Sequence, residues 1–104
     1  MEELTLLQFW LRDMRDSTIF QCPPVTCKDG LSMSIQASVH HYCTPRNNIG
    51  PWTHVEVGFP TKHVKEFEKY GDDAYSSVYC FVPIELVAKV IKKHGGWSDE
   101  QQLA

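Results

Sequence analysis

Leu31-Ser-Met-Ser-Ile-Gln-Ala-Ser-Val39 is the stretch of this sequence that decides the fold. Apolar and small polar residues alternate through it at a period of two, which is typical of a strand with one face on a core. The face expected to pack on the core carries Leu31, Met33, Ile35, Ala37 and Val39. The face expected to meet water carries Ser32, Ser34, Gln36 and Ser38.

Two helices and a hairpin are predicted around this strand. Leu4, Leu7, Leu11 and Met14 recur at helical spacing, which indicates an amphipathic helix. Asp29-Gly30 favours a tight turn that pairs the long strand with a short one before it. The predicted elements are a helix over 2–16, a hairpin over 25–39, strands over 52–59 and 77–82, a helix over 83–94 and a short tail over 97–104.

Signals at the element ends support this order. Pro83 suits the first position of the last helix, and Gly95-Gly96 suits its end. Residues 60–76 are expected to be a connection with a helical turn around 64–70. The run 77–82 is apolar on both faces, as in a central strand. We therefore predict one α+β domain over 1–104: a mostly antiparallel sheet of three to four strands, with the N-terminal and C-terminal helices packed on one face.

Composition narrows the class of protein. The chain has 104 residues and a formal net charge of −3, which argues against direct nucleic-acid binding, because phosphate neutralisation needs an excess of Lys and Arg. Its apolar runs are too short to span a bilayer. The acidic start, Met1-Glu2-Glu3, is unlike a secretory signal. We expect a small soluble cytoplasmic protein without membrane contact.

Four cysteines and five histidines raise the question of metal binding and catalysis. A zinc knuckle would use Cys22, Cys27 and Cys43 with His40 or His41, but the spacing is irregular for such a site. Cys43 lies near His41 without a third catalytic group in the pattern. We predict no metal, no cofactor, no disulfide and no enzymatic activity. Cys27 and Cys80 are expected in strand cores, and Cys22 and Cys43 in loops.

The segment 40–52 is the candidate binding surface, because it concentrates residue types that recognise other molecules. Arg pairs with carboxylates or phosphates, and Arg, Tyr and Trp are enriched in interface hot spots. The candidate binding residues are His40, His41, Tyr42, Arg46, Asn47, Asn48 and Trp52, with His54 and Glu56 on the next strand. A structural interpretation is equally open: Arg46 pairs with an acid such as Glu56, and Trp52 fills the edge of the core.

A resemblance adds a hypothesis about function. The segments 31–38, 41–46, 50–52, 55–60 and 82–87, with the Lys93–Gly96 ending, resemble a group of short bacteriophage proteins of unassigned role, over residues 28–96. The resemblance carries no catalytic residues. It implies a phage or prophage accessory protein, a class from which inhibitors of bacterial defence such as anti-CRISPR proteins are drawn.

We therefore expect a non-enzymatic protein that binds and modulates a host protein in a bacterial cytoplasm, with a defence-system inhibitor as the specific hypothesis. A homodimer is left open. The alternative function is a module that holds a small anionic ligand, such as a nucleotide, through the 40–52 segment. A zinc-binding knuckle is the third interpretation.

Overall fold

The computed structural model describes residues 2–16, 18–19, 21–73 and 76–102. The elements in chain order are α1 (Glu2–Asp13), β1 (Val25–Thr26), β2 (Ser32–Gln36), β3 (His54–Gly58), the 3-10 helix η1 (Lys65–Tyr70), β4 (Val78–Pro83), α2 (Ile84–Lys93) and α3 (Asp99–Gln102). No helix within these described ranges is both long and apolar enough to cross a membrane.

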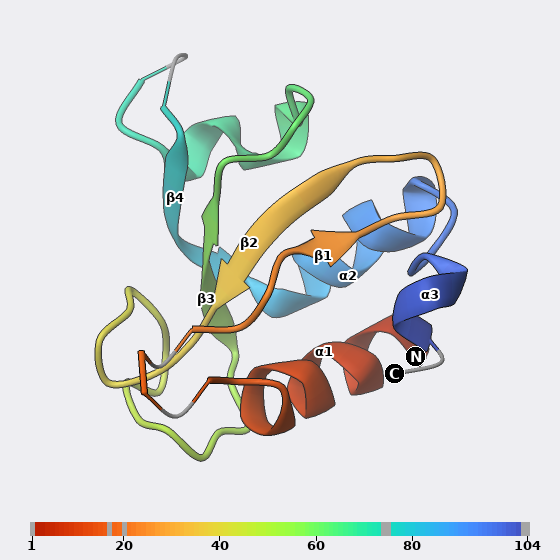
Figure 1. Cartoon of the computed structure of the whole chain (residues 1–104). Helices are drawn as coiled ribbons and strands as arrows, with labels where there is room; N and C mark the ends of the chain where they lie inside the picture. Colours follow the sequence, from red (N-terminus) through yellow and green to blue (C-terminus); the bar gives the residue numbers. More distant parts are fainter. Residues whose placement is uncertain (1, 17, 20, 74–75, 103–104) are drawn as a thin grey trace.

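The strands form one antiparallel sheet in the order β1-β2-β3-β4 (Figure 1). Ile35 of β2 pairs with Val57 of β3, and Val55 of β3 pairs with Val82 of β4. The helices α1 and α2 contact each other and share one hydrophobic core with the sheet. The predicted α+β class, with an antiparallel sheet and helices from both ends of the chain, is therefore confirmed.

The core lies between the helices and one face of the sheet. Alternation in β2 and β3 places Met33, Ile35, Val55 and Val57 in it, and each is at most 1% exposed. The helices add the buried residues Leu7, Leu11, Val87, Val90 and Ile91. Period-two and period-3.6 patterns thus meet in a single core, as the sequence predicted.

Two predictions about the long alternating stretch are wrong. Gln36 and Ser38 are buried rather than exposed to solvent, and Val39 is 42% exposed rather than in the core. Gln36 is buried because the segment before β1 crosses over it: its side chain accepts a hydrogen bond from Cys22 N (2.8 Å) and donates one to Cys22 O (2.9 Å). The strand ends at Gln36, so the alternation no longer sets the facing of the residues that follow.

The position of β4 also differs from the prediction. The run 77–82 was expected in the centre of the sheet, but β4 is an edge strand. Val82 is buried, whereas Val78 and Phe81 are 37% and 44% exposed. The apolar residues on its outer side therefore belong to the molecular surface and not to a second core.

The remaining boundaries shift by a few residues. The first helix ends at Asp13 instead of residue 16, and the strands near 52–59 and 77–82 occupy 54–58 and 78–83. The expected helical turn is present as η1. The segment over 97–104 is more than a tail, because Trp97 is 3% exposed and bridges to Cys27, and α3 follows it.

Candidate functional site

The connection between β2 and β3 contains the predicted binding segment. Buried hydrogen bonds among residues 38–43 hold the start of this connection in place. Ser38 Oγ lies 2.6 Å from His41 Nδ1 and accepts a hydrogen bond from His40 N at 3.0 Å. Cys43 Sγ donates to Ser38 O at 3.2 Å. Ser38 is 0% exposed and His41 is 7% exposed, so this Ser–His pair is closed to a substrate and holds the turn together.

His41 is held neutral by its surroundings. Burial lowers its pKa, because the charged imidazolium loses its hydration, and the nearby charges of His40, Arg15 and Arg46 lower it further against the opposing effect of Glu56. His41 is therefore part of the frame of the segment rather than a charged binding group.

Asn47, Asn48 and Trp52 also hold the segment in shape. Asn47 Oδ1 accepts hydrogen bonds from Ile49 N and Gly50 N, and Asn48 Oδ1 accepts one from Val39 N. Trp52 is 2% exposed and donates from Nε1 to Asn47 O at 3.2 Å. Arg15, just after α1, ties the segment to the helical layer by donating to the carbonyls of Ala37 and Asn48. The interpretation of Trp52 as a residue that fills the core edge is confirmed.

Arg46 and Tyr42 lie on the outside and contact each other. The Arg46 guanidinium carbon is 5.4 Å from the centre of the Tyr42 ring, and Arg46 Nε donates to Val39 O at 3.2 Å. Glu56 instead accepts a hydrogen bond on its carboxylate from Tyr42 N at 3.2 Å. The aromatic stack, rather than an ion pair with Glu56, orients Arg46.

The stack continues onto the edge strand. The rings of Tyr42 and Phe81 are 6.0 Å apart between centroids, and Phe81 N donates to Tyr42 O at 3.2 Å. In β4, Cys80 and Phe81 both lie opposite Glu56 of β3, because the pairing steps from Val57–Tyr79 to Val55–Val82. This β-bulge turns Phe81 toward the segment that carries Tyr42.

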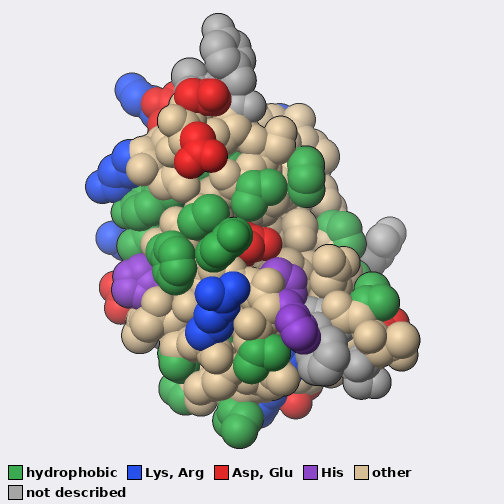
Figure 2. All heavy atoms as spheres, turned by 90° about the vertical axis from the view of Figure 1, so that its left-hand side faces the viewer, with side chains coloured by type: hydrophobic (Ala, Val, Ile, Leu, Met, Phe, Trp, Pro, Cys, Tyr) green, Lys and Arg blue, Asp and Glu red, His purple; other side chains and the backbone are tan. Residues whose placement is uncertain are grey.

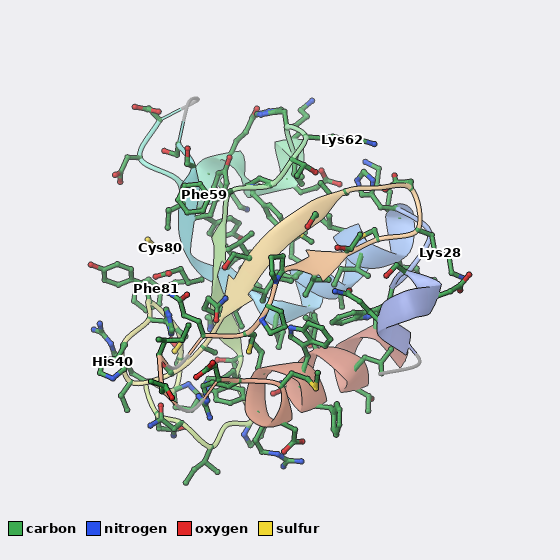
Figure 3. The ribbon with its side chains drawn as sticks, viewed as in Figure 1. Lys28, His40, Phe59, Lys62, Cys80 and Phe81 are labelled. Carbon is green, nitrogen blue, oxygen red and sulfur yellow. The ribbon has the colours of Figure 1, made fainter. Side chains whose placement is uncertain are left out.

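Arg46, Tyr42 and Phe81, together with the residues beside them along the outer side of β4 and at the end of β3, form a surface that we call the aromatic face. Its members are Tyr42, Arg46, Phe59, Val78, Cys80 and Phe81. Figure 3 shows Phe59, Cys80 and Phe81 one after another down the outer side of β3 and β4, with His40 below them. Figure 2 looks onto this side: hydrophobic side chains gather in the middle with one acidic side chain among them, further acidic side chains lie above, and Lys or Arg and His side chains lie below.

Phe59 and Phe81 have a backbone conformation that phenylalanine rarely adopts. Their φ angles are 52° and 53°, in the left-handed region that favours glycine. Pro60 follows Phe59 and favours extended backbone there, which adds to the conflict. The side chains are 68% and 44% exposed, so burial returns little of the cost. Strain of this kind concentrates at functional positions.

Sequence reasoning did not find Phe59, Val78 or Phe81 as site residues. Their neighbours gave a strand pattern, and an apolar residue in a strand is expected in a core. The available signal was that the run 77–82 is apolar on both faces. Such a strand either has both faces buried or leaves one apolar face on the surface. Only the strand order, which puts β4 at the edge of the sheet, shows that one apolar face of this strand is exposed.

His54 and Glu56 have separate partners. His54 Nδ1 lies 2.8 Å from Thr53 Oγ1, whereas Glu56 accepts from the Tyr42 amide. His54 also lines an open depression of about 470 Å³, together with Trp52 and Glu85. Arg46 is not among its lining residues, so the depression does not combine a cation with the aromatic rings predicted for an anion site.

All four cysteines are free thiols. Burial raises the pKa of Cys22 and of Cys27 to about 11, which keeps both protonated. Cys22 and Cys43 lie outside the helices and strands, as expected, although both are buried, and Cys80 is partly exposed rather than in the core. Among the described residues, no three His, Cys, Asp or Glu side chains come together as a metal site would require.

The aromatic face is thus a chemically distinctive surface of the described chain: three aromatic rings, two of them on strained backbone, with a stacked Arg46 at one end. Tyr42, Phe59, Val78 and Phe81 are each at least 37% exposed, so the apolar side chains of this face meet solvent. No protein-family model, curated protein or solved structure matches this chain.

Proposed function

We propose that this protein is a non-enzymatic binding protein that docks onto another protein through the aromatic face. The observation that carries the proposal is the pair Phe59 and Phe81, which are exposed and held at positive φ. Glycine would fit either backbone better, and neither ring is needed to fill the core. Rings kept at such positions favour a role in recognition.

The composition of the face supports the same conclusion. Tyr and Arg are enriched in interface hot spots, where large rigid rings contribute contact area at small entropic cost. Tyr42 N donates to the Glu56 carboxylate and Tyr42 O accepts from Phe81 N, and Arg46 is oriented by Tyr42 and Val39. Such pre-organisation lowers the cost of ordering the surface when a partner binds.

The specific function that we propose is inhibition of a host protein by a phage or prophage protein in a bacterial cytoplasm, with an anti-CRISPR-type defence inhibitor as the leading case. Its support is the resemblance of residues 28–96 to short phage proteins. The alternative, a small anionic ligand held by Arg46 with Tyr42 and Trp52, has less support because Trp52 is buried and its ring nitrogen is already bonded to Asn47 O. The zinc knuckle has no support among the described residues.

Cross-linking in living cells tests the docking surface. A photoreactive benzoylphenylalanine replaces Phe59, or, as a matched control, Phe9, which is 50% exposed on α1. We expect defined cross-linked products from position 59 and none from position 9. Equal products from both positions, or none from position 59, would contradict docking through the aromatic face.

A plaque assay tests the specific function. The protein is expressed in bacteria that carry an active CRISPR–Cas system directed against a phage. We expect wild-type protein and Phe9→Ala to restore plaques, and Phe81→Ala or Arg46→Ala to restore at least about tenfold fewer, as for loss of a hot-spot contact. Full activity of both face variants would refute the assignment of the face.

A further inference from the structure

We infer that the aromatic face binds a second copy of this chain, in a twofold arrangement that joins the two faces. The inference rests on the proposed docking role of the face, but it concerns the free protein before any other partner is present. Three features carry it: the order of charges along the face, the apolar centre between them and the irregular edge of β4.

The first feature is an acidic end. Ser76 Oγ accepts hydrogen bonds from the backbone amides of Asp72 (2.8 Å) and Asp73 (3.0 Å), which folds this turn onto the start of β4. Gly71 is close enough to β4 that a Cβ there would lie 3.2 Å from the Tyr79 ring. Asp72 is exposed, and its charge contributes to the raised pKa of Cys80, after burial and Glu56. The Asp72 carboxylate therefore borders the face.

The second feature is a basic end on the opposite side. Arg46 is exposed and stacks on Tyr42, and Tyr42 contacts Phe81 near the end of β4. Between the two charges lie Val78, Cys80 and Phe81. Glu56, opposite Cys80 and Phe81, is a further acid beside them, and its carboxylate accepts a hydrogen bond from Tyr42 N. From the Asp72 end to the Arg46 end the surface thus changes from acidic to basic across an apolar centre, and Figure 2 shows acidic side chains at the top, one more among the hydrophobic ones, and a Lys or Arg below them.

Such a surface is its own complement. A twofold axis through the apolar centre places Val78 and Phe81 of one copy on the same patch of the other, and brings Arg46 of each copy toward Asp72 of the other. Both charge pairs are then satisfied at once, which is the condition for a self-complementary interface. A surface of one charge sign would instead repel its own copy.

The third feature decides how the copies meet. The β-bulge at Cys80 and Phe81 breaks the regular edge, and the Phe81 amide is already bonded to Tyr42 O. Bulges protect an edge strand from pairing with another strand. The contact is therefore made by side chains, face on face, and not by extension of the sheet.

Charge exchange in the purified full chain is the decisive experiment. Sedimentation analysis over a range from low micromolar to millimolar concentration is expected to show a monomer–dimer equilibrium for the wild type. Arg46→Glu alone and Asp72→Lys alone are each expected to weaken the dimer at least about tenfold, because both symmetric pairs become repulsive. The double variant Arg46→Glu/Asp72→Lys is expected to regain most of the affinity, because the exchanged charges are again complementary.

The control is Arg12→Glu, which makes the same charge change on the exposed side of α1 and should leave the dimer unchanged. A monomer at every concentration, or a dimer that the double exchange does not restore, overturns the inference. The cellular cross-links from position 59 are sorted by mass: a product of two copies of this chain reports the dimer, and a product with a different protein reports the proposed function. The inference and the proposed function can therefore fail separately. Rescue by exchange within one chain identifies a second copy as the occupant, since a different partner would keep its original charges.

Cys80 provides a second measurement. It is the one partly exposed thiol of the four, and it lies near the middle of the face, where the axis passes. A short bismaleimide is expected to link two chains through Cys80 in the wild type and in the double exchange variant, but not in Arg46→Glu. Cys80→Ser should remove the product. Linkage that is equally strong in Arg46→Glu would contradict the twofold arrangement.

Discussion

At the scale of single residues, Phe59 is the clearest conflict between local conformation and residue type. Its backbone has φ of 52°, its side chain is 68% exposed, and its amide donates to Ser77 O at 2.6 Å. The hydrogen bond fixes the chain direction at the end of β3, and a phenyl group gains little there by burial. The position of the ring supports the docking role that we propose for the aromatic face.

Replacing Phe59 by glycine separates stability from function. We expect Phe59→Gly to raise the free energy of unfolding by up to about 1 kcal/mol, because relief of a left-handed non-glycine residue outweighs the extra freedom of glycine in the unfolded chain. Phe59→Ala keeps a Cβ and should give no such gain. Urea denaturation of both variants checks this. An equal loss of stability in both would mean that ring packing, not the backbone, governs the site.

His41 is a buried group whose protonation conflicts with its hydrogen bonds. Ser38 Oγ accepts from His40 N, so its own hydrogen is free to donate to His41 Nδ1 when the ring is neutral. Protonation adds a hydrogen to Nδ1 and leaves the fully buried Ser38 hydroxyl without that acceptor. The neutral ring is therefore the form that fits the fold.

The stability of the protein should consequently depend on pH through His41. Its pKa is lowered in the folded state, so below the ordinary value of 6.5 the unfolded chain binds a proton that the folded chain does not. The free energy of unfolding is expected to fall as the pH drops below 6.5, until the folded pKa is reached. Denaturant melts at a series of pH values give the free energy of unfolding as a function of pH. For His41→Gln this free energy is expected to fall less steeply below pH 6.5 than for the wild type. An equally steep fall in both proteins would show that His41 is not the cause.

At the scale of elements, β2 shows where a periodic pattern stops being structural. Ile35 is inside β2 and 0% exposed, whereas Val39 follows the strand and is 42% exposed, although both continue the same alternation. Ile35→Ala is expected to lower the free energy of unfolding by about 2–5 kcal/mol through cavity formation, and Val39→Ala by less than about 0.5 kcal/mol. Similar losses in the two variants, measured by denaturant melts, would mean that the strand extends to residue 39.

The elements with a regular period could be predicted from the sequence, but the position of each strand in the sheet and the burial of its polar residues could not. Residues 31–36 and 84–93 have alternation or helical spacing with clear end signals, so local chemistry determines them. The edge position of β4 depends on the order of strands, which is a long-range property. The burial of Gln36 depends on a single crossing segment at Cys22.

The candidate site was predictable only in part for the same reason. Tyr42 and Arg46 stood out by residue type and do lie on the outside. Asn47, Asn48 and Trp52 belong to the same residue types, yet their polar atoms and ring are used within the molecule. Composition identifies groups capable of recognition, and only the fold distributes them between the frame and the surface.

At the scale of the whole molecule, the two edge strands of the sheet differ in what lies beside them. The segment after α2 covers β1: Lys28 N donates to Gly96 O, Ser98 N donates to Thr26 O, and Gln101 bonds to Thr26 N and Pro24 O. The β4 edge has a bulge and the aromatic face instead. The covered edge closes the fold, and the other edge, with its bulge, exposes the apolar side chains of the aromatic face.

Trp97 is the centre of the closed edge. It is 3% exposed, it bridges to Cys27, and its ring lies 5.1 Å from that of Trp10 on α1, so it joins the two ends of the chain. Trp97→Ala is expected to lower the free energy of unfolding by about 3–5 kcal/mol, because it leaves a large cavity between α1 and β1. Denaturant melts followed by circular dichroism measure this loss.

The exposed Phe9 provides the comparison for Trp97, since Phe9→Ala should change stability by no more than about 0.5 kcal/mol. Because Trp97 lies at the closed edge and the aromatic face at the other, Trp97→Ala should leave the dimer affinity unchanged under conditions where the variant is folded. A variant that stays within about 1 kcal/mol of the wild type would show that the segment after α2 is an appendage rather than part of the core. A stable fold with a weakened dimer would show that the two edges are coupled through the sheet.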